Sequence, residues 1–335
     1  TGTRFEICAV GVSGPRFASD EDYLRRKFRE DVTDSSTGIG LVQLKAEAVR
    51  KANELKGREP WCLVKAHLFE SICDRMSIGV SRHDYFPAVA VWSRKDRVLS
   101  PVLAARIDEV QKRDCEAARR SLTRVPKSCI RLDYDHATPD WDSALQLGFT
   151  GLRARLLRIE EKNDFHRAML IATDAMLRHV RRLADYAKAC PDADDPRVKA
   201  EAEALDHLCR GAPRTSYEAM LFQWLFFIYG EHVDHLQVRT LGNWDRLMGP
   251  YYERDLANGV LTRESFKELV KHFWWQWGSI NNWWGQPVYI GGTKANGETE
   301  YNEVSRIVLE VQDELALPTP KLQMKIADNT PDDIF

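Results

Sequence analysis

The stretch EHVDHLQVRTLGNWDRLMGPYYERDLANGVLTRESFKELVKHFWWQW, residues 231–277, combines clustered charge, a sharp turn and a strongly amphipathic helical segment. Thr262 carries a helix-start signal. Apolar residues at the spacing of one helix face follow it: Phe266, Leu269, Val270, Phe273 and Trp274. A polar run that leads into such a face is more typical of a pocket wall than of a plain core element.

The same helical periodicity runs through most of the chain. It predicts helices at 39–55, 59–76, 101–122 and 164–189, from Thr215 through Phe227, and from Asn302 onward. Short runs rich in β-formers predict strands or extended segments at 78–92, 288–290 and 322–326. Residues 131–141 have the Asp, Thr and Pro content of a loop. The fold is therefore mostly helical, with a few short strands.

Composition limits the class of protein. The 335 residues are 44% hydrophobic with ten tryptophans, so a sizeable core can form. Lys plus Arg (48) nearly balance Asp plus Glu (50), and without a basic stripe we expect no nucleic-acid partner. The longest apolar stretch, 219–229, is too short to cross a bilayer, which predicts no membrane association and a cytoplasmic protein. Seven cysteines without paired spacing predict reduced thiols.

The last residues also carry a signal. Thr330-Pro331-Asp332-Asp333 has the N-cap, proline and acidic first turn of a helix start. Only Ile334 and Phe335 follow it. We therefore expect the chain to be the front part of a longer protein.

Several weak motifs occur in a distinctive order. They are AHLFESI at 66–72, DHATPDWDSALQLGFTGL at 135–152, FHRAMLIATDAMLRHVRRLADYA at 165–187, PYYERDLANGVLTRESFKELVKHFW at 250–274, YIGGT at 289–293 and YNEVSRIVLEVQDELALPTPKLQMKI at 301–326. Over roughly residues 40–335 this order resembles the N-terminal half of a glycyl radical enzyme of the pyruvate formate-lyase type. The strength of the resemblance lies in the order of the motifs rather than in any one of them.

The resemblance implies an α/β fold, a barrel of strands ringed by helices, with residues 1–335 forming the N-terminal part of one domain. It implies a glycyl radical installed by an iron–sulfur activating enzyme that uses S-adenosylmethionine, and a thiyl cysteine. Both radical positions would lie beyond residue 335, so this segment would hold no catalytic residue. We further expect no bound cofactor, a small organic acid as substrate, and a homodimer.

The resemblance also implies substrate-binding residues. His136 lies in a loop whose family counterpart touches substrate, and nearby carboxylates would favour its protonated form; it could equally tie the loop together. Gln237, Val238 and Arg239 fall at pocket positions. Dehydratases of the family carry a histidine or an acid where Gln237 stands, so the amide disfavours dehydration. Arg239 could bind a carboxylate or form a surface ion pair.

Three further pocket positions are Trp283, Trp284 and Gly285. Family members place a large side chain where Gly285 stands, so a bulky substrate could fit and the tryptophans could stack on an aromatic ring. Alternatively Trp284 fills the same volume. Asn243 replaces the arginine that is common in the family, so a local ion pair is expected to differ.

The cluster Glu231, His232, Asp234 and His235 could hold a divalent metal, form a polar network or contact substrate. The order His-Glu-x-x-His of zinc hydrolases is absent, so we predict a polar network and no metal.

These residues predict a glycyl-radical lyase acting on a bulky, aryl-bearing carboxylate, for example an arylacetate decarboxylase. Three alternatives are a fumarate-adding aryl- or alkylsuccinate synthase, a radical dehydratase of a small hydroxylated substrate, and a non-catalytic helical scaffold or binding module.

Overall fold

The computed structural model describes residues 15–27, 36–89, 98–110, 112–113, 136–234, 236–238, 240–280 and 286–335. Its helices are α2 (Pro15–Arg26), α3 (Leu41–Leu55), α4 (Trp61–Arg75), α5 (Ser100–Val110), α7 (Trp141–Leu157), α8 (Asp164–Ala189), α9 (Pro196–Leu208), α10 (Ser216–Phe227), α11 (Trp244–Ala257), α12 (Arg263–Ile280) and α13 (Glu303–Leu315). A π-helix, η3 (Ile228–Val233), continues α10, and a 3-10 turn, η4 (Asp332–Ile334), lies near the end of the chain.

The strands are short: β1 (Ser36–Thr37), β2 (Ile78–Gly79), β3 (Ala88–Val89), β4 (His136–Ala137), β5 (Gln237–Val238), β6 (Pro287–Gly291) and β7 (Lys321–Lys325). The first three form an antiparallel sheet, whereas β4–β5 and β6–β7 are parallel pairs. The predicted mostly helical portion is confirmed. The parallel strands agree with the predicted α/β class, but the described residues show no closed barrel.

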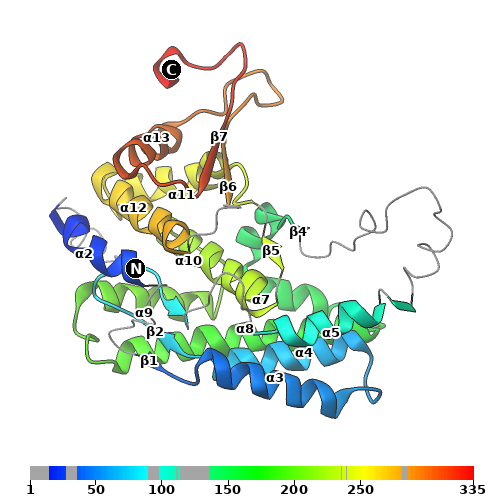
Figure 1. The fold of residues 1–335 in the computed structure, drawn as a ribbon. Coiled ribbons are helices and arrows are strands. Elements are labelled where there is room, and N and C mark those ends of the chain that lie inside the picture. Colours follow the sequence, from blue (N-terminus) through cyan, green and yellow to red (C-terminus); the bar gives the residue numbers. More distant parts are fainter. Residues whose placement is uncertain are drawn as a thin grey trace.

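The helices form two groups joined by α10. Figure 1 shows α3, α4, α5 and α8 side by side in one half of the molecule, and α11, α12 and α13 in the other. α10 lies between them because its sequence is apolar on nearly every side. Leu221, Phe222, Trp224 and Leu225 are all fully buried. The predicted central position of this helix is therefore confirmed.

Helix starts follow the capping residues that the sequence contains. The Thr215 hydroxyl accepts a hydrogen bond from the Glu218 N–H at 3.2 Å, and the Asn302 side chain accepts one from the Ser305 N–H at 3.3 Å. Each bond satisfies one of the backbone donors that a helix start leaves unpaired. The predicted starts of α10 and α13 are confirmed.

Several boundaries differ from the prediction. The described part of the predicted 101–122 helix, α5, ends at Val110, and the helix-start signal at 330–333 forms only the single turn η4. No pattern predicted α2, which packs against α12 (Figure 1). None of the helices in the described ranges is long and apolar enough to span a membrane. The four cysteines that lie in those ranges are free thiols, as predicted: Cys62, Cys73, Cys190 and Cys209.

Candidate functional site

Two segments that are far apart in the sequence meet in the parallel pair β4–β5. His136 stands opposite Gln237, and Ala137 stands opposite Val238. The sequence assigned His136 and Gln237 separately to a substrate wall. The backbone register now makes the two residues direct neighbours on adjacent strands.

The segment after β5 joins this pair to the second parallel pair. The Leu241 N–H donates to the Pro287 carbonyl at 2.9 Å, and the Tyr289 N–H donates to the Gly242 carbonyl at 3.0 Å. The parallel segments therefore follow one another in the order β4, β5 with residues 240–243, β6 and β7. Residues from four separate parts of the sequence thus contribute to one face.

Close packing fixes the middle of this face. The Trp141 indole N–H donates to the Thr240 carbonyl at 2.9 Å, which ties α7 to the segment after β5. Gly242 has φ +80°, and a Cβ there would lie 3.1 Å from the Trp141 ring and 3.0 Å from Leu247. The positive φ favours glycine here, and a side chain would also force Leu247 or Trp141 to shift. Asn243, where a different polar contact was expected, accepts a 2.6 Å hydrogen bond from the Lys325 ammonium.

The π-helix η3 leads directly into β5. Its wider turns bury Glu231, His232 and Val233, and the Leu236 N–H closes the end of the helix on the Gly230 carbonyl at 2.7 Å. Short π-helical segments often occur at functional sites. The Glu231 carboxylate accepts a 3.2 Å hydrogen bond from the Gln286 side chain, which precedes β6.

The remaining acid of the predicted cluster contacts the outer helices. Asp234 pairs with Lys65 of α4 at 2.9 Å. Burial raises the pKa of the Asp234 carboxyl, and the neighbouring Lys65 ammonium opposes that rise. No group of three or more acid, histidine or cysteine side chains suited to a metal ion occurs within the described ranges, and His235 lies outside them. Glu231 and Asp234 thus make separate polar contacts, and the polar network without a metal stays a prediction.

An aromatic cluster backs the strands. Trp277 makes edge-to-face contacts with Phe227 and Trp224 at centroid distances of 4.6 and 5.2 Å. Such contacts stabilise the interior beyond simple area burial. The cluster also includes Trp244, Phe273 and Trp274.

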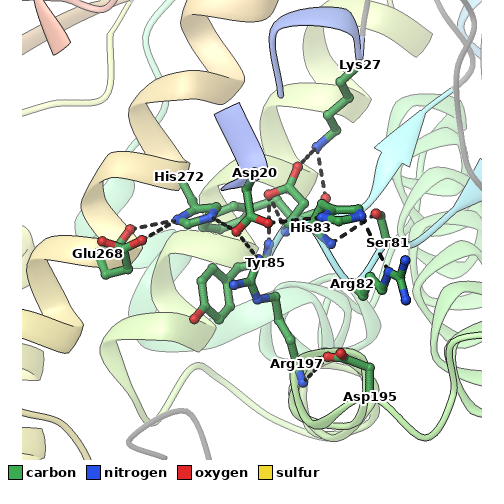
Figure 2. Close-up of polar contacts among 12 residues, drawn as sticks. Asp20, Lys27, Ser81, Arg82, His83, Tyr85, Asp195, Arg197, Glu268 and His272 are labelled. Carbon is green, nitrogen blue, oxygen red and sulfur yellow. Dashed lines mark hydrogen bonds and ion pairs between the residues drawn. The ribbon is translucent and has the colours of Figure 1, made fainter. Parts of the chain in front are cut away.

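A second polar cluster joins α2 to the core, and Figure 2 shows it. Asp20 of α2 accepts hydrogen bonds from Arg197 at 2.8 Å and His272 at 3.2 Å. These contacts lower the pKa of Asp20 against the opposing effect of burial. At the end of α2 the Lys27 ammonium pairs with Asp84 at 2.6 Å. The side chains of all five residues are buried.

Glu201 lies beside this cluster and is also fully buried. Burial raises the pKa of its carboxyl well above the usual range, and the charge of Asp84 adds to the rise. Lys27 pairs with Asp84, and Arg197 pairs with Asp20. These buried contacts attach α2 to the core.

Residues 104–335, more than half of the chain, match the family model "Pyruvate formate lyase-like". The chain belongs to the pyruvate formate-lyase-like glycyl radical enzymes. The predicted family is thereby confirmed. The match does not resolve the subgroup within the family.

Two curated members of the radical enzyme family differ in their reactions. The chain is 28% identical over 225 residues to trans-4-hydroxy-L-proline dehydratase of Clostridioides difficile, a match that covers 57% of this chain and 28% of the dehydratase. It is 24% identical over 189 residues to the glycyl radical subunit of 4-hydroxyphenylacetate decarboxylase of the same organism. That match covers 51% of this chain and 21% of the subunit.

The fold is similar to that of a solved family member. The glycerol-bound B12-independent glycerol dehydratase from Clostridium butyricum superimposes with a TM-score of 0.72 at 17% identity. The match covers 94% of this chain and 48% of the dehydratase chain. This chain thus spans about half of a radical enzyme subunit.

The predicted site residues fall into two groups. The backbones of His136, Gln237 and Val238 lie together in β4 and β5. Arg239 and residues 283–285 (Trp283, Trp284 and Gly285) are outside the described residues, so their assignment to the substrate wall stays a prediction. The sequence analysis did not predict a role for Gln286. The available signal was its position as a polar residue directly before a buried strand.

Proposed function

We propose that the native protein is a radical dehydratase of a small hydroxylated substrate. This was an alternative to the aryl-carboxylate lyase, and the comparisons support it better. The named dehydratase has the higher identity of the two curated relatives, and a glycerol dehydratase shares the fold. The observation that carries the proposal is the β4–β5 pair, which brings two predicted substrate-binding residues together.

In the family the glycyl radical takes a hydrogen atom from a cysteine. The thiyl radical that forms then starts the reaction by removing a hydrogen atom from the substrate. The residues of this chain would bind and orient the substrate. Gln237 stands where dehydratases of the family carry a histidine or an acid, and its amide would not supply a proton. It can instead donate to one hydroxyl and accept from another, which holds a diol in a fixed orientation. His136 would supply the proton that the departing hydroxyl needs in order to leave as water. The aromatic cluster behind the strands would keep water away from the radical.

Product analysis of the activated full-length protein tests this proposal. The protein would be incubated without oxygen with an activating enzyme, S-adenosylmethionine and a panel of glycerol, propane-1,2-diol, trans-4-hydroxy-L-proline and 4-hydroxyphenylacetate. We expect loss of water from one of the hydroxylated aliphatic compounds. His136→Asn is expected to slow that reaction about a hundredfold, the usual range for loss of a general acid. Conversion of 4-hydroxyphenylacetate alone would reject the dehydratase.

Decarboxylation of an arylacetate is the second candidate. The similarity to the decarboxylase subunit and the absence of a side chain at Gly285 favour it. Gly285→Phe separates the two candidates, because the new ring would occupy the space that an aryl group needs. We expect turnover of a large acid to fall more than turnover of a small substrate. Equal loss for both would argue against an enlarged cavity.

We further propose the surroundings in which this chemistry takes place. The partner would be an iron–sulfur activating enzyme that uses S-adenosylmethionine. The protein would be a homodimer. It would be located in the cytoplasm, because an oxygen-sensitive radical needs a reducing compartment.

A further inference from the structure

Two buried side chains, those of Glu231 and Gln286, connect the π-helix before β5 to the start of β6. Glu231 and Gln286 each expose only 3% of their surface. The Gln286 side-chain N–H donates to the Glu231 carboxylate at 3.2 Å. Glu231 lies in the π-helix that leads into β5, and Gln286 is the residue immediately before β6.

The bond reaches a third strand through the backbone. The Gln286 carbonyl accepts a 3.1 Å hydrogen bond from the Lys321 N–H at the start of β7. One glutamine thus contacts the segment before β5 through its side chain and β7 through its main chain. Its side-chain oxygen, Oε1, is buried and has no partner among the described residues. The hydrogen bonding of this side chain within the described part of the chain is therefore confined to Glu231.

The position of the pair relates it to the substrate wall. Gln237 and Val238 follow Glu231 by six and seven residues, and Gly285 directly precedes Gln286. The π-helix that leads into β5 and the start of β6 are thus connected by one buried hydrogen bond. A shift of that bond would change the distance between β5, which contains two predicted substrate-binding residues, and the start of β6.

We propose that Glu231 and Gln286 form a positioning pair that sets the separation between β5 and the start of β6. The inference rests on the proposed function, because it assigns the pair to the same substrate wall. Neither residue needs to touch substrate. A misplacement of about 1 Å in a substrate-positioning element can lower turnover by about a hundredfold.

The test compares Gln286→Leu with a matched control. Gln223→Leu also removes a fully buried glutamine that makes a side-chain hydrogen bond, here to the Trp244 indole N–H at 3.0 Å, but it does so on α10. An exchange variant, E231Q/Q286E, restores the bond with donor and acceptor reversed. All variants are made in the full-length protein and activated without oxygen.

Two readouts are measured for each variant. The first is kcat/KM on the member of the substrate panel that the wild type converts, with radical content measured by electron paramagnetic resonance. The second is hydrogen exchange of the backbone at 237–242 and 287–291, which needs no turnover.

We expect Q286L to lower kcat/KM at least about tenfold at unchanged radical content, and to reduce protection of both strands. Q223L should stay within about threefold of wild type, and the exchange variant should recover. Equal effects of Q286L and Q223L, or an exchange variant as impaired as Q286L, would overturn the pair. A wild type that forms no radical or converts no substrate would reject the proposed function, while the exchange data would still decide the inference.

Discussion

Asp84→Asn is expected to detach α2 from the core. The Lys27 ammonium is fully buried and pairs with the Asp84 carboxylate at 2.6 Å. The Lys27 ammonium also donates to the Phe86 carbonyl at 2.9 Å and to the Gln276 side-chain oxygen. These neutral acceptors satisfy its N–H groups but not its charge. Breaking a buried ion pair at one partner costs about 3–5 kcal/mol. The opening equilibrium of α2 should therefore rise by roughly two to four orders of magnitude.

The same substitution gives a pH dependence with a definite sign. Burial lowers the pKa of Lys27 in the native protein, and Asp84 opposes that decrease. In Asp84→Asn the pKa of Lys27 falls further below its unfolded value. Between the folded and the unfolded pKa of Lys27 the unfolded state then binds more protons than the folded state, so stability should rise with pH there by up to about 1.4 kcal/mol per unit.

Hydrogen exchange of residues 15–27 measures this opening locally. The matched control is Glu54→Gln, which breaks the exposed ion pair of Glu54 with Arg50 and should cost less than about 1 kcal/mol. The double variant Lys27→Met, Asp84→Asn removes both charges and should recover most of the protection. Exchange of α2 in Asp84→Asn that matches the Glu54→Gln control would refute the reasoning.

Three further substitutions test the packing around the site. Glu201→Gln should raise stability at pH 7. The folded carboxyl keeps its proton to a higher pH than the unfolded one, which ionises above about pH 4.5, so the stability of the wild type falls as the pH rises from there. Denaturation at pH 5 and pH 7 should show a smaller fall in stability for the variant. Gly291→Ala should cost at least about 2 kcal/mol of stability, because φ is +72° and a Cβ would lie 2.1 Å from the Tyr301 ring. The control is Gly297→Ala, where φ is +87° but the space is open, so that it measures the backbone contribution alone. Equal melting temperatures for the two variants would contradict the clash with Tyr301. Trp141→Phe keeps an aromatic ring, though a smaller one, and loses the bond to the Thr240 carbonyl. Exchange at 240–242 should therefore accelerate by a factor that corresponds to at least about 1 kcal/mol, and unchanged exchange would show that the bond contributes nothing.

Local signals in the sequence predicted the long helices well. Asp164–Ala189 is both the predicted and the observed extent of α8, because its apolar stripe is regular and Asn163 caps it. The central position of α10 was predicted correctly because its sequence is almost wholly apolar. Eleven of its twelve residues are buried. Capping and periodicity are properties of neighbouring residues, so they can be read from the sequence alone.

Contacts between distant residues were harder to predict. α2 inserts Asp20 and Lys27 into the core, and charged residues at core positions have no apolar periodicity. β4 and β5 contain two residues each, too few to produce an alternating pattern, and they pair across about a hundred positions. The resemblance to a family placed His136 and Gln237 in one wall, whereas local propensity could not.

Substrate class was the least accessible prediction. The aryl-carboxylate prediction relied on Gly285 and the amide of Gln237, two single positions in a pocket formed by several elements. The curated relatives support the small-substrate alternative better. A substrate preference depends on how several side chains face one cavity, and a single sequence does not contain that arrangement.

Electron paramagnetic resonance of the anaerobically activated full-length protein tests the central claim most directly. If these residues build part of a glycyl radical enzyme, activation should produce the doublet of a glycyl radical, and the doublet should disappear on exposure to air. Correctly folded protein that gives no such doublet with a competent activating enzyme would contradict the account.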